Sequence, residues 1–173
     1  FSHGSQDLYP VFLQTQHGYD AATTGTIAIV MNLGALCGGI VFGAFSEKLG
    51  RKKAIIAAAL LALPMIPLWA FSTAPLIFAA GAFFMQFAVQ GAWGVVPAHL
   101  NELSPQPVRA ILPGFSYQIG NLLMSKIGPI QAGLAERNGN DYASVLAWTV
   151  AIVSISLAAV TFLGKEETAA EFR

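Results

Sequence analysis

The sequence predicts an all-α polytopic membrane protein that folds as a six-helix bundle. Composition points to the membrane, because 55% of the residues are hydrophobic and only 10% are charged, with a mean hydropathy of +0.60. A soluble domain carries about 25% charged residues. The long apolar runs are rich in Ala, Leu and Gly and lack the two-residue alternation of an outer-membrane barrel. A short cationic turn, residues 46–53, separates two of these runs and is typical of a cytoplasmic loop.

The first half of the chain contains three expected spans. Residues 1–14 form most of one helix, and because the chain starts without Met we expect a fragment of a longer protein. After a polar connection, residues 24–45 hold two pairs of glycines four residues apart, a spacing that lets membrane helices approach closely. Residues 54–71 hold two prolines, which we expect to kink this span. These marker residues are Gly34 with Gly38, Gly39 with Gly43, and Pro64 with Pro67.

The second half contains three further spans, residues 76–98, 110–134 and 142–163. A helix needs about 20 residues to cross the bilayer, so each complete run is long enough. The fifth span is the least apolar of the three. Polar segments separate and follow these spans, at residues 72–75, 99–109 and 136–141 and in a charged tail, residues 164–173.

The distribution of cations predicts the orientation of the bundle. If the 46–53 loop is cytoplasmic, alternation of the spans places the 99–109 loop and the tail on the same side, and Arg137 alone lies outside. We therefore expect an integral protein of the plasma (inner) membrane with a cytoplasmic C-terminus. The cations on the expected inner side are Lys48, Arg51, Lys52, Lys53, Arg109, Lys165 and Arg173.

The 46–53 loop belongs to a recognisable motif. The stretch from Gly43 to Lys53 resembles the G-x-x-x-[D/E]-[R/K]-x-G-[R/K]-[R/K] loop of major facilitator superfamily transporters. We expect Gly43 to permit a close helix contact, Gly50 to permit a tight turn, and Glu47 to pair with Arg51. The resemblance implies a loop that takes part in conformational gating. The residues in register are Gly43, Glu47, Lys48, Gly50, Arg51 and Lys52.

A second loop, Glu102 to Arg109, resembles the facilitator pattern E-x-x-P-x-x-x-R-G, with Ala110 in place of the final glycine. Glu102 and Arg109 can pair with each other, or with the 46–53 loop, in one conformation and separate in another. The alternative is a solvated loop, because surface ion pairs are individually weak.

Four polar residues in the first span are candidates for proton coupling and substrate binding. His3 and Asp7 are spaced i, i+4 and share one helix face, and Ser5 and Gln6 add polarity. Charged groups in a membrane span are costly and indicate function, and an imidazole beside a carboxylate can relay a proton. The alternative is that these residues lie at the aqueous mouth of the bundle.

These residues also carry a closer resemblance. The stretch Ser2 to Asp7 is similar to the seventh-helix signature N-x-x-[S/T]-H-x-[S/T]-Q-D-x-x-x-T of Jen-type lactate and pyruvate permeases, in the sialate:proton symporter family, with Val11 at the place of the last Thr. The similarity continues through residues 93–105 and 113–123. It implies helices 7–12, the C-terminal half of a major facilitator fold, with the N-terminal half as its missing partner. It also implies a small carboxylate, such as lactate, pyruvate or sialate, that moves with a proton.

Other polar residues inside the spans are candidates for a substrate path. Gln86 and Gln90 share a face and either line the path or bond helix to helix. Lys126 lies beyond the middle of the fifth span and either attracts an organic anion or snorkels to the interface. The full set is Asn32, Gln86, Gln90, Tyr117, Gln118, Asn121 and Lys126.

The function that these observations favour is secondary transport, by rocking of two halves around a site near the midplane. The sequence has no phosphate-binding loop for ATP, and its zero net charge gives no sign of a nucleic acid partner. An integral-membrane enzyme is disfavoured because no nucleophile, metal or paired-cysteine motif is present, and we expect no cofactor and no metal. A non-transporting sensor on the same fold remains an alternative.

Overall fold

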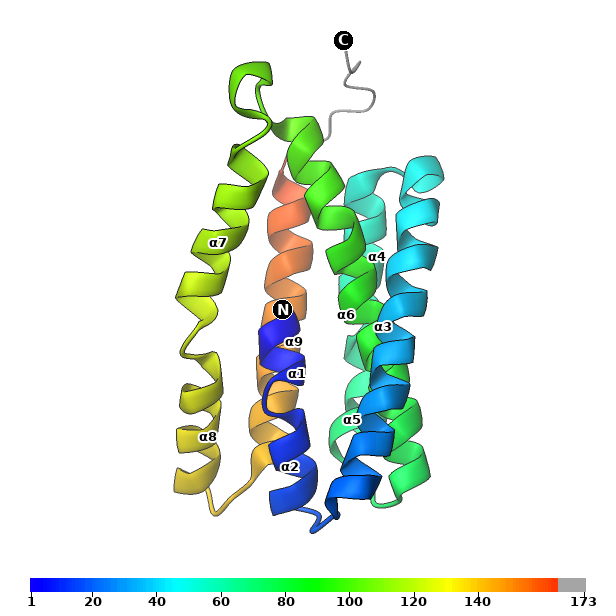
Figure 1. Ribbon diagram of the computed structural model, residues 1–173, viewed down its shortest axis with the longest axis vertical. Helices are drawn as coiled ribbons and strands as arrows, with labels where there is room; N and C mark the ends of the chain where they lie inside the picture. The colour runs from blue at the N-terminus through cyan, green and yellow to red at the C-terminus, as the bar shows by residue number, and fades with distance from the viewer. Residues whose placement is uncertain (165–173) are drawn as a thin grey trace.

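The computed structural model describes residues 1–164, and all regular structure within them is helical. The helices run side by side along the long axis of the molecule (Figure 1). Four segments, Ala21–Leu49, Arg51–Ala70, Pro75–Leu103 and Tyr142–Leu163, are long and apolar enough to cross a membrane. The predicted all-α membrane fold is thereby confirmed. The elements are α1 (Ser2–Gln6), α2 (Tyr9–Thr15), α3 (Ala21–Leu49), α4 (Arg51–Leu61), η1 (Leu63–Met65), α5 (Ile66–Ala70), α6 (Pro75–Leu103), η2 (Gln106–Val108), α7 (Leu112–Met124), α8 (Ile127–Arg137) and α9 (Tyr142–Leu163).

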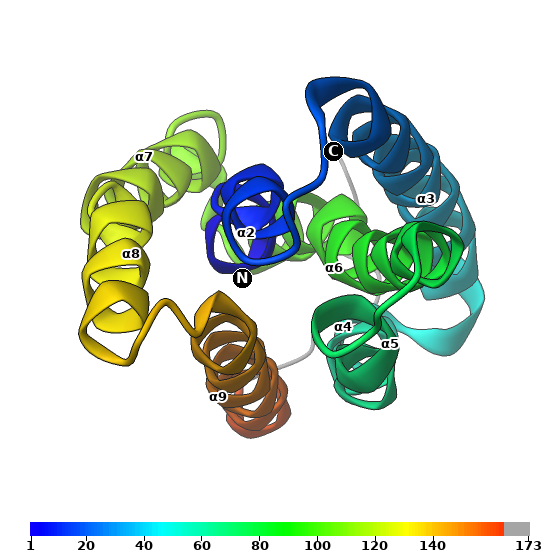
Figure 2. The ribbon, with the colours of Figure 1, turned by 90° about the horizontal axis from the view of Figure 1, so that it is seen from below.

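Seen along this axis, α1–α2 lies between α6 on one side and α7–α8 on the other, with α9 beside it and α3 on the far side of α6 (Figure 2). Grouping the helical pieces that share one column gives six columns: α1–α2, α3, α4–α5, α6, α7–α8 and α9. The first column therefore has helical neighbours on several sides, which bury Gly4 and Ser5 of α1 and leave His3 partly exposed.

Two columns that we expected as continuous helices are broken. In the first, α1 ends at Gln6 and α2 begins at Tyr9, and in the fifth, α7 ends at Met124 and α8 begins at Ile127. Proline explains both breaks, because it lacks the amide hydrogen that would bond to the carbonyl four residues earlier. Pro10 leaves the Gln6 carbonyl without its helical donor, and Pro129 does the same for Ser125.

The third column is also interrupted, as we expected from its two prolines. The α-helix α4 gives way to the short 3₁₀-helix η1, which contains Pro64, and then to α5, which contains Pro67 near its start. The column nevertheless remains long and apolar enough, over Arg51–Ala70, to cross a membrane.

The expected loops at 46–53 and 99–109 are shorter than predicted. Helix α3 continues to Leu49 and α4 starts at Arg51, so a single residue, Gly50, makes the turn. Its φ of 93° and ψ of 149° lie in a region that glycine alone readily adopts. Helix α6 likewise continues to Leu103. Both helices extend because charged side chains such as Glu47 and Lys48 are good helix formers once they reach water.

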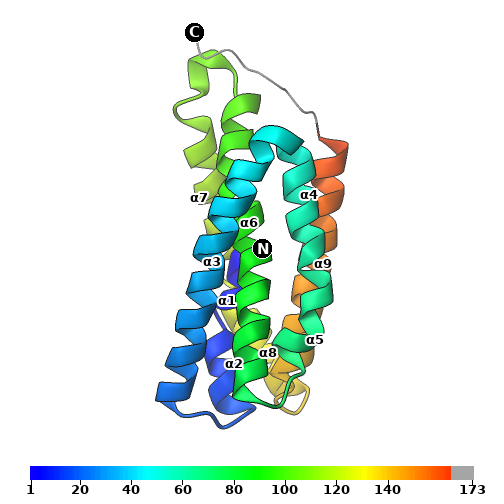
Figure 3. The same cartoon turned by 90° about the vertical axis from the view of Figure 1, so that its right-hand side faces the viewer.

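Helices α3 and α6 run side by side (Figure 3), and glycines pack their interface. A Cβ added at Gly34 would overlap the backbone of Phe83, and one added at Gly38 would overlap the backbone of Phe87. The expected close contact at Gly43 is wrong, because nothing lies within 4 Å of a Cβ placed there. Gly39 still lies beside Gly94 of α6, whereas Gly43 has rotated away from the side of Gly34 and Gly38, because the helix turns about 100° per residue.

An aromatic cluster holds α2 in place below the break in the first column. The rings of Tyr9 and Trp69 stack with centroids 5.0 Å apart, and the Tyr9 hydroxyl donates to the Trp69 carbonyl at 2.9 Å. The Phe12 and Phe78 rings meet edge to face at 5.7 Å. All four side chains are fully buried, so α2 is fixed by packing while α1 above it depends on other contacts.

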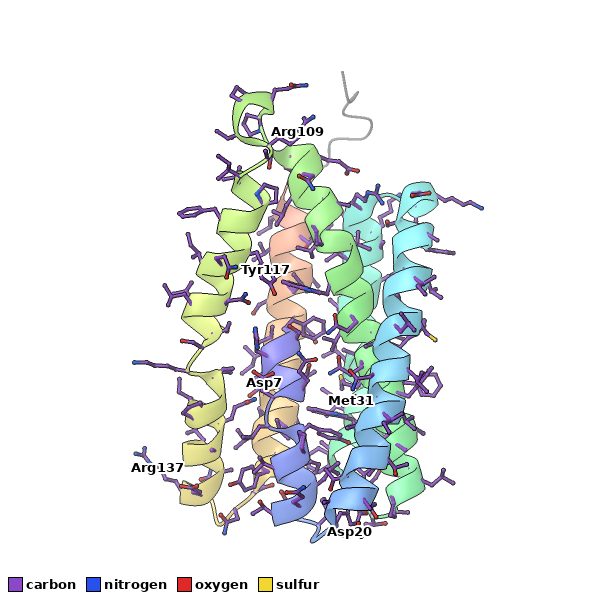
Figure 4. The ribbon with its side chains drawn as sticks, viewed as in Figure 1. Asp7, Asp20, Met31, Arg109, Tyr117 and Arg137 are labelled. Carbon is purple, nitrogen blue, oxygen red and sulfur yellow. The ribbon has the colours of Figure 1, made fainter. Side chains whose placement is uncertain are left out.

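The two ends of the bundle differ in character. Arg109 lies at one end, and Arg137 and Asp20 lie at the other (Figure 4). At the Arg109 end, Lys52 donates to the carbonyls of Phe162 and Gly164 and so binds the last turn of α9 to the start of α4. The predicted tail beyond Gly164, with Lys165 and Arg173, lies outside the described residues.

At the opposite end, two carboxylates cap helices. Asp20 accepts a hydrogen bond from the Thr23 amide at the start of α3, and Asp141 accepts one from the Ser144 amide at the start of α9. Hydrogen bonds from Thr23 hold the pKa of Asp20 below its usual value, and hydrogen bonds from Ser144 do the same for the pKa of Asp141. Such caps begin both helices cleanly at the same end of the bundle.

Candidate functional site

His3 is the centre of a hydrogen-bonded group between the first and fifth columns. Its Nδ1 lies 2.9 Å from Asp7 Oδ2, one turn along the chain, and its Nε2 lies 3.2 Å from Asn121 Oδ1 on α7. Asp7 lies near mid-height of the bundle, far from both ends (Figure 4). The predicted His3–Asp7 proximity is therefore present, and Asn121 joins it from another column.

Both ring nitrogens of His3 face oxygen atoms, and this limits the states of the group. A protonated imidazole donates to the Asp7 carboxylate and to the Asn121 carbonyl oxygen at once, whereas a neutral ring has one N–H to give. The His3 and Asp7 side chains are 40% and 43% exposed. Both side chains are therefore partly accessible at the surface of the described chain, and the Asn121 contact joins α1 to α7.

A cavity of about 410 Å³ opens beside this group, between α1, α6 and α7. Its polar lining comes from His3, Ser116, Tyr117 and Asn121, among other residues. The remaining wall is largely apolar and includes Trp93, Val96, Pro97, Leu100, Pro113 and Met124. His3 and Asn121 therefore line the cavity while Asp7 lies off its wall, and most of the remaining lining is hydrophobic.

The Trp93 and Tyr117 rings join the two walls of this cavity. Their centroids lie 5.4 Å apart at an interplanar angle of 44°, which links α6 directly to α7. Tyr117 is 44% exposed, and no residue of α7 is buried. Among the described residues, few side chains therefore attach α7 to the other helices, and Tyr117 and Asn121 are two of them.

Ser5 and Gln6 do not line the cavity, and both bond α1 to α6. Ser5 is fully buried, and its hydroxyl donates to the Ser2 carbonyl at 2.9 Å. The Gln86 amide reaches the Ser5 hydroxyl, and the Gln90 amide reaches the Gln6 side-chain oxygen, each at 3.5 Å. Of the two roles open for Gln86 and Gln90, the structure shows contacts from helix to helix.

Three further residues of the expected substrate path lie off this cavity wall. Asn32 is exposed on α3 and donates to the Ala28 carbonyl of its own helix. Gln118 is exposed on α7, and Lys126 is exposed at the break between α7 and α8. Among the seven predicted path residues, Tyr117 and Asn121 are the two that the structure brings to the cavity.

At the Arg109 end, the two predicted gating loops meet through Arg51. Arg51 Nε donates to Glu102 Oε1 at 2.9 Å, and Arg51 Nη1 donates to the Ser46 hydroxyl at 2.6 Å. Ser46 in turn donates to the Gly43 carbonyl at 2.7 Å. The expected Glu47–Arg51 pair is wrong, because Arg51 points along the helix ends towards α6 while Glu47 is exposed on the outer face of α3.

The other predicted gating residues surround this network. Lys48 is exposed near the end of α3, and Lys52 binds the end of α9 as described above. Arg109 Nε donates to the Ser104 carbonyl at 3.2 Å, within its own loop. The ion pair between Arg51 and Glu102 therefore joins the α3–α4 turn to the end of α6, with side chains that are 23% and 15% exposed.

One polar residue near the site was not anticipated. Gln131 on α8 is buried at 1% exposure, and its Nε2 donates to the Gly4 carbonyl at 2.9 Å. A glutamine inside a membrane span is itself a signal, but in the least apolar span it does not stand out from its neighbours. Its importance lies in the contact with α1, which sequence spacing alone does not reveal.

The sequence profile of the family described as "Sugar (and other) transporter" matches residues 3–165. The chain belongs to this family. It is a family of the major facilitator superfamily, as the loop motif predicted. The match begins at His3 and covers every described helix after α1, so both the site and the gating network lie within it.

Individual relatives agree with this assignment. The chain is 36% identical, over 96% of its length, to a carboxylic acid transporter protein homolog of Saccharomyces cerevisiae. It is 27% identical over 72% of its length to the glucose transporter GlcP of Staphylococcus epidermidis, and 33% identical over half its length to inositol transporter 4 of Arabidopsis thaliana. It spans 29%, 27% and 15% of these relatives respectively. Because the matched relatives are transporters, the comparisons argue against an enzyme.

Proposed function

We propose that this chain is the C-terminal half of a proton-coupled symporter for small carboxylates. The observation that carries the proposal is the His3–Asp7 pair, 2.9 Å apart and near mid-height of the bundle, whose His3 lines a cavity of about 410 Å³. The carboxylic acid transporter homolog of yeast, 36% identical over nearly the whole chain, supports the substrate class. The N-terminal half of the same transporter would complete the site.

The coupling follows from charge. An ionised Asp7 repels a substrate carboxylate, and two like charges about 4 Å apart repel by about 4 kcal/mol at an effective dielectric constant of 20. That energy corresponds to roughly a thousandfold in affinity. One proton taken up by the His3–Asp7 pair cancels the negative charge and admits the anion. Substrate and proton then bind together and leave together.

The cavity wall narrows the choice among carboxylates. Lactate and pyruvate are short, and each can place its methyl group against Trp93, Val96 or Leu100 while its carboxylate reaches His3. Sialate carries many hydroxyl groups, and each one buried without a partner costs about 1–3 kcal/mol. We therefore favour lactate and pyruvate over sialate as substrates.

Alternating access would use the network at the Arg109 end. We propose that this end is cytoplasmic, as the cation asymmetry predicts, and that the Arg51–Glu102 pair forms in one conformation and separates in another. The test is a single cysteine placed at Glu47 or at Asn140 in a cysteine-free full-length background. We expect an impermeant maleimide to label intact cells at residue 140, and to label residue 47 after permeabilisation only. The reverse pattern contradicts this orientation.

Uptake by the purified full-length transporter in proteoliposomes tests the proposed function directly. With an acidic exterior and a neutral interior, we expect accumulation of labelled lactate and pyruvate that a protonophore abolishes, and little uptake of sialate or glucose. Uptake that ignores the pH gradient contradicts proton coupling, and preferential uptake of glucose contradicts the carboxylate assignment. A folded protein without any flux would indicate a sensor.

A further inference from the structure

Gln131 makes a buried contact with the backbone of α1, the helix that carries His3 and is followed directly by Asp7. Its Nε2 donates to the Gly4 carbonyl at 2.9 Å, and its side chain is 1% exposed. Gly4 itself is buried, and a Cβ there would lie 2.9 Å from the Thr149 side chain on α9. The backbone of α1 is therefore held from α8 by a hydrogen bond and from α9 by close packing.

The Gly4 carbonyl is available to Gln131 because the first column is broken. In a continuous helix this carbonyl would accept the amide of residue 8. Here the Asp7 amide bonds to the His3 carbonyl at 3.3 Å, and among the described residues the Leu8 amide makes no such bond to Gly4. The Gln131 side chain, from another column, thus donates the hydrogen bond that the Leu8 amide would donate to Gly4 in a continuous helix.

Asn121 and Gln131 contact neighbouring residues of α1 from opposite sides of a second break. Asn121, on α7, faces His3 Nε2 at 3.2 Å, and Gln131, on α8, bonds to the next residue, Gly4. The fifth column is interrupted between them, at Ser125 and Lys126. The piece with Asn121 has no buried residue, whereas the piece with Gln131 has two. Gln131 therefore holds α1 from the better-packed of the two pieces.

A helix as short as α1, with five residues, cannot hold its own position, because isolated short helices are marginal. The Gln131 side-chain oxygen, moreover, is buried without a hydrogen-bond partner among the described residues. An unsatisfied buried amide oxygen is unfavourable, so an apolar side chain would pack here at lower cost. The hydrogen bond to the Gly4 carbonyl is the favourable interaction that the Gln131 amide makes and that an apolar side chain would lack.

We propose that Gln131 is a positioning residue for the proton site: it fixes the rotation and height of α1, so that His3 lies between Asp7 and Asn121. This inference rests on the proposed proton-coupled function. Loss of the Gln131 bond lets α1 shift, which lengthens the His3 contacts. The pH dependence of transport and the affinity for substrate then both change, without a change in the groups that bind them.

The experiment measures uptake of labelled lactate against pH by full-length wild type, Gln131→Leu, Gln131→Glu and the control Gln14→Leu, which alters an exposed glutamine on α2. We expect Gln131→Leu to raise KM about three- to tenfold, the effect of losing one hydrogen bond, and to displace the pH profile. For Gln131→Glu, the protonated acid can donate to the Gly4 carbonyl and the carboxylate cannot. Its defect should therefore be relieved at acidic pH, and Gln14→Leu should match wild type.

Surface labelling of the transporter separates positioning from folding. A variant whose Vmax falls in proportion to its amount in the membrane, with KM and pH profile unchanged, overturns the inference. If Gln131→Leu does not reach the membrane, the pH dependence of Gln131→Glu tests the inference instead. A defect of Gln131→Glu that is equal at all pH values overturns the inference too. Failure of the proposed function gives a different result, because wild type itself would then lack pH-driven uptake.

Discussion

The α3–α6 interface and the surroundings of α1 are built in opposite ways. Between α3 and α6, glycines bring two long unbroken helices into backbone contact, with no room for a methyl group at Gly34 or Gly38. Around α1, a five-residue helix is held by side-chain hydrogen bonds to Asn121 and Gln131 and borders a cavity of about 410 Å³. One region is fixed by backbone packing and the other by polar side chains.

From this difference we infer separate roles for the two regions under the proposed function. Close-packed helices move as a unit, because interiors packed at crystal density resist small shifts. A short helix held by hydrogen bonds responds when a proton or an anion alters one of those bonds. The α3–α6 pair is suited to act as the frame, and α1 with α7 as the part that responds. Substitutions in the frame should change the amount of folded protein, and substitutions at the site should change coupling.

The largest expected effect belongs to Gly38→Leu. The new side chain overlaps the backbone of Phe87, which cannot yield, at a cost of at least about 3 kcal/mol. We expect the yield of folded transporter, measured by size-exclusion chromatography in detergent, to fall about tenfold or more. Gly25→Leu and Gly43→Leu are matched controls, because a Cβ at either meets nothing within 4 Å. Yields that fall equally in all three variants would contradict the claim that the Gly38 contact with α6 holds the frame together.

A smaller effect is expected where the frame meets the gating loops. Arg51→Ala removes a partly exposed ion pair with Glu102 and the bond to Ser46, worth about 1 kcal/mol. The balance between the two conformations should shift about fivefold, and the uptake rate should change accordingly with folded yield unaltered. The exchanged pair, Arg51→Glu with Glu102→Arg, should restore part of the rate. A double variant no better than Arg51→Ala contradicts the ion pair as the functional contact.

The smallest expected effect concerns the turn between α2 and α3. His17 packs against Phe12 and Phe78 with ring centroids 5.0 and 4.6 Å apart, and burial lowers its pKa. Below about pH 6.5 the unfolded chain then binds more protons than the folded one, so acidification destabilises the fold. Wild type should lose more Tm between pH 7.5 and 5.5 than His17→Phe does. Equal losses would show that His17 does not contribute to the acid sensitivity.

The spacing of residues in the sequence predicted the contacts and turns that form between residues close together in the chain. His3 and Asp7 lie one turn apart in any helix, and their contact is present. The glycine at 50 makes the turn that its motif indicated. Pro64 and Pro67 interrupt the third column as expected, whereas the breaks that Pro10 and Pro129 cause in the first and fifth columns differ from the continuous helices predicted there.

Of the contacts between distant residues, sequence patterns predicted only that Glu102 can pair with the 46–53 loop, and they did not single out Arg51 as its partner. Arg51 pairs with a residue 51 positions away, and His3 meets a residue 118 positions away. Which glycines face a neighbouring helix depends on the rotation of α3 against α6, so Gly34 and Gly38 of the predicted glycine pairs meet the backbone of α6 whereas Gly43 does not. Gln131 was missed for the same reason, since its partner is a backbone carbonyl in another column.

The most direct test of the His3–Asp7 pair as the proton site is Asp7→Asn in the full-length transporter. The amide keeps a hydrogen-bonding oxygen near His3 but cannot take up a proton. With labelled lactate in vesicles, we expect the variant to lose accumulation driven by an imposed pH gradient. It should still exchange labelled for unlabelled substrate across the membrane. Accumulation against a gradient as strong as that of wild type would contradict the account, and Asp7 would then be a carboxylate without a role in coupling.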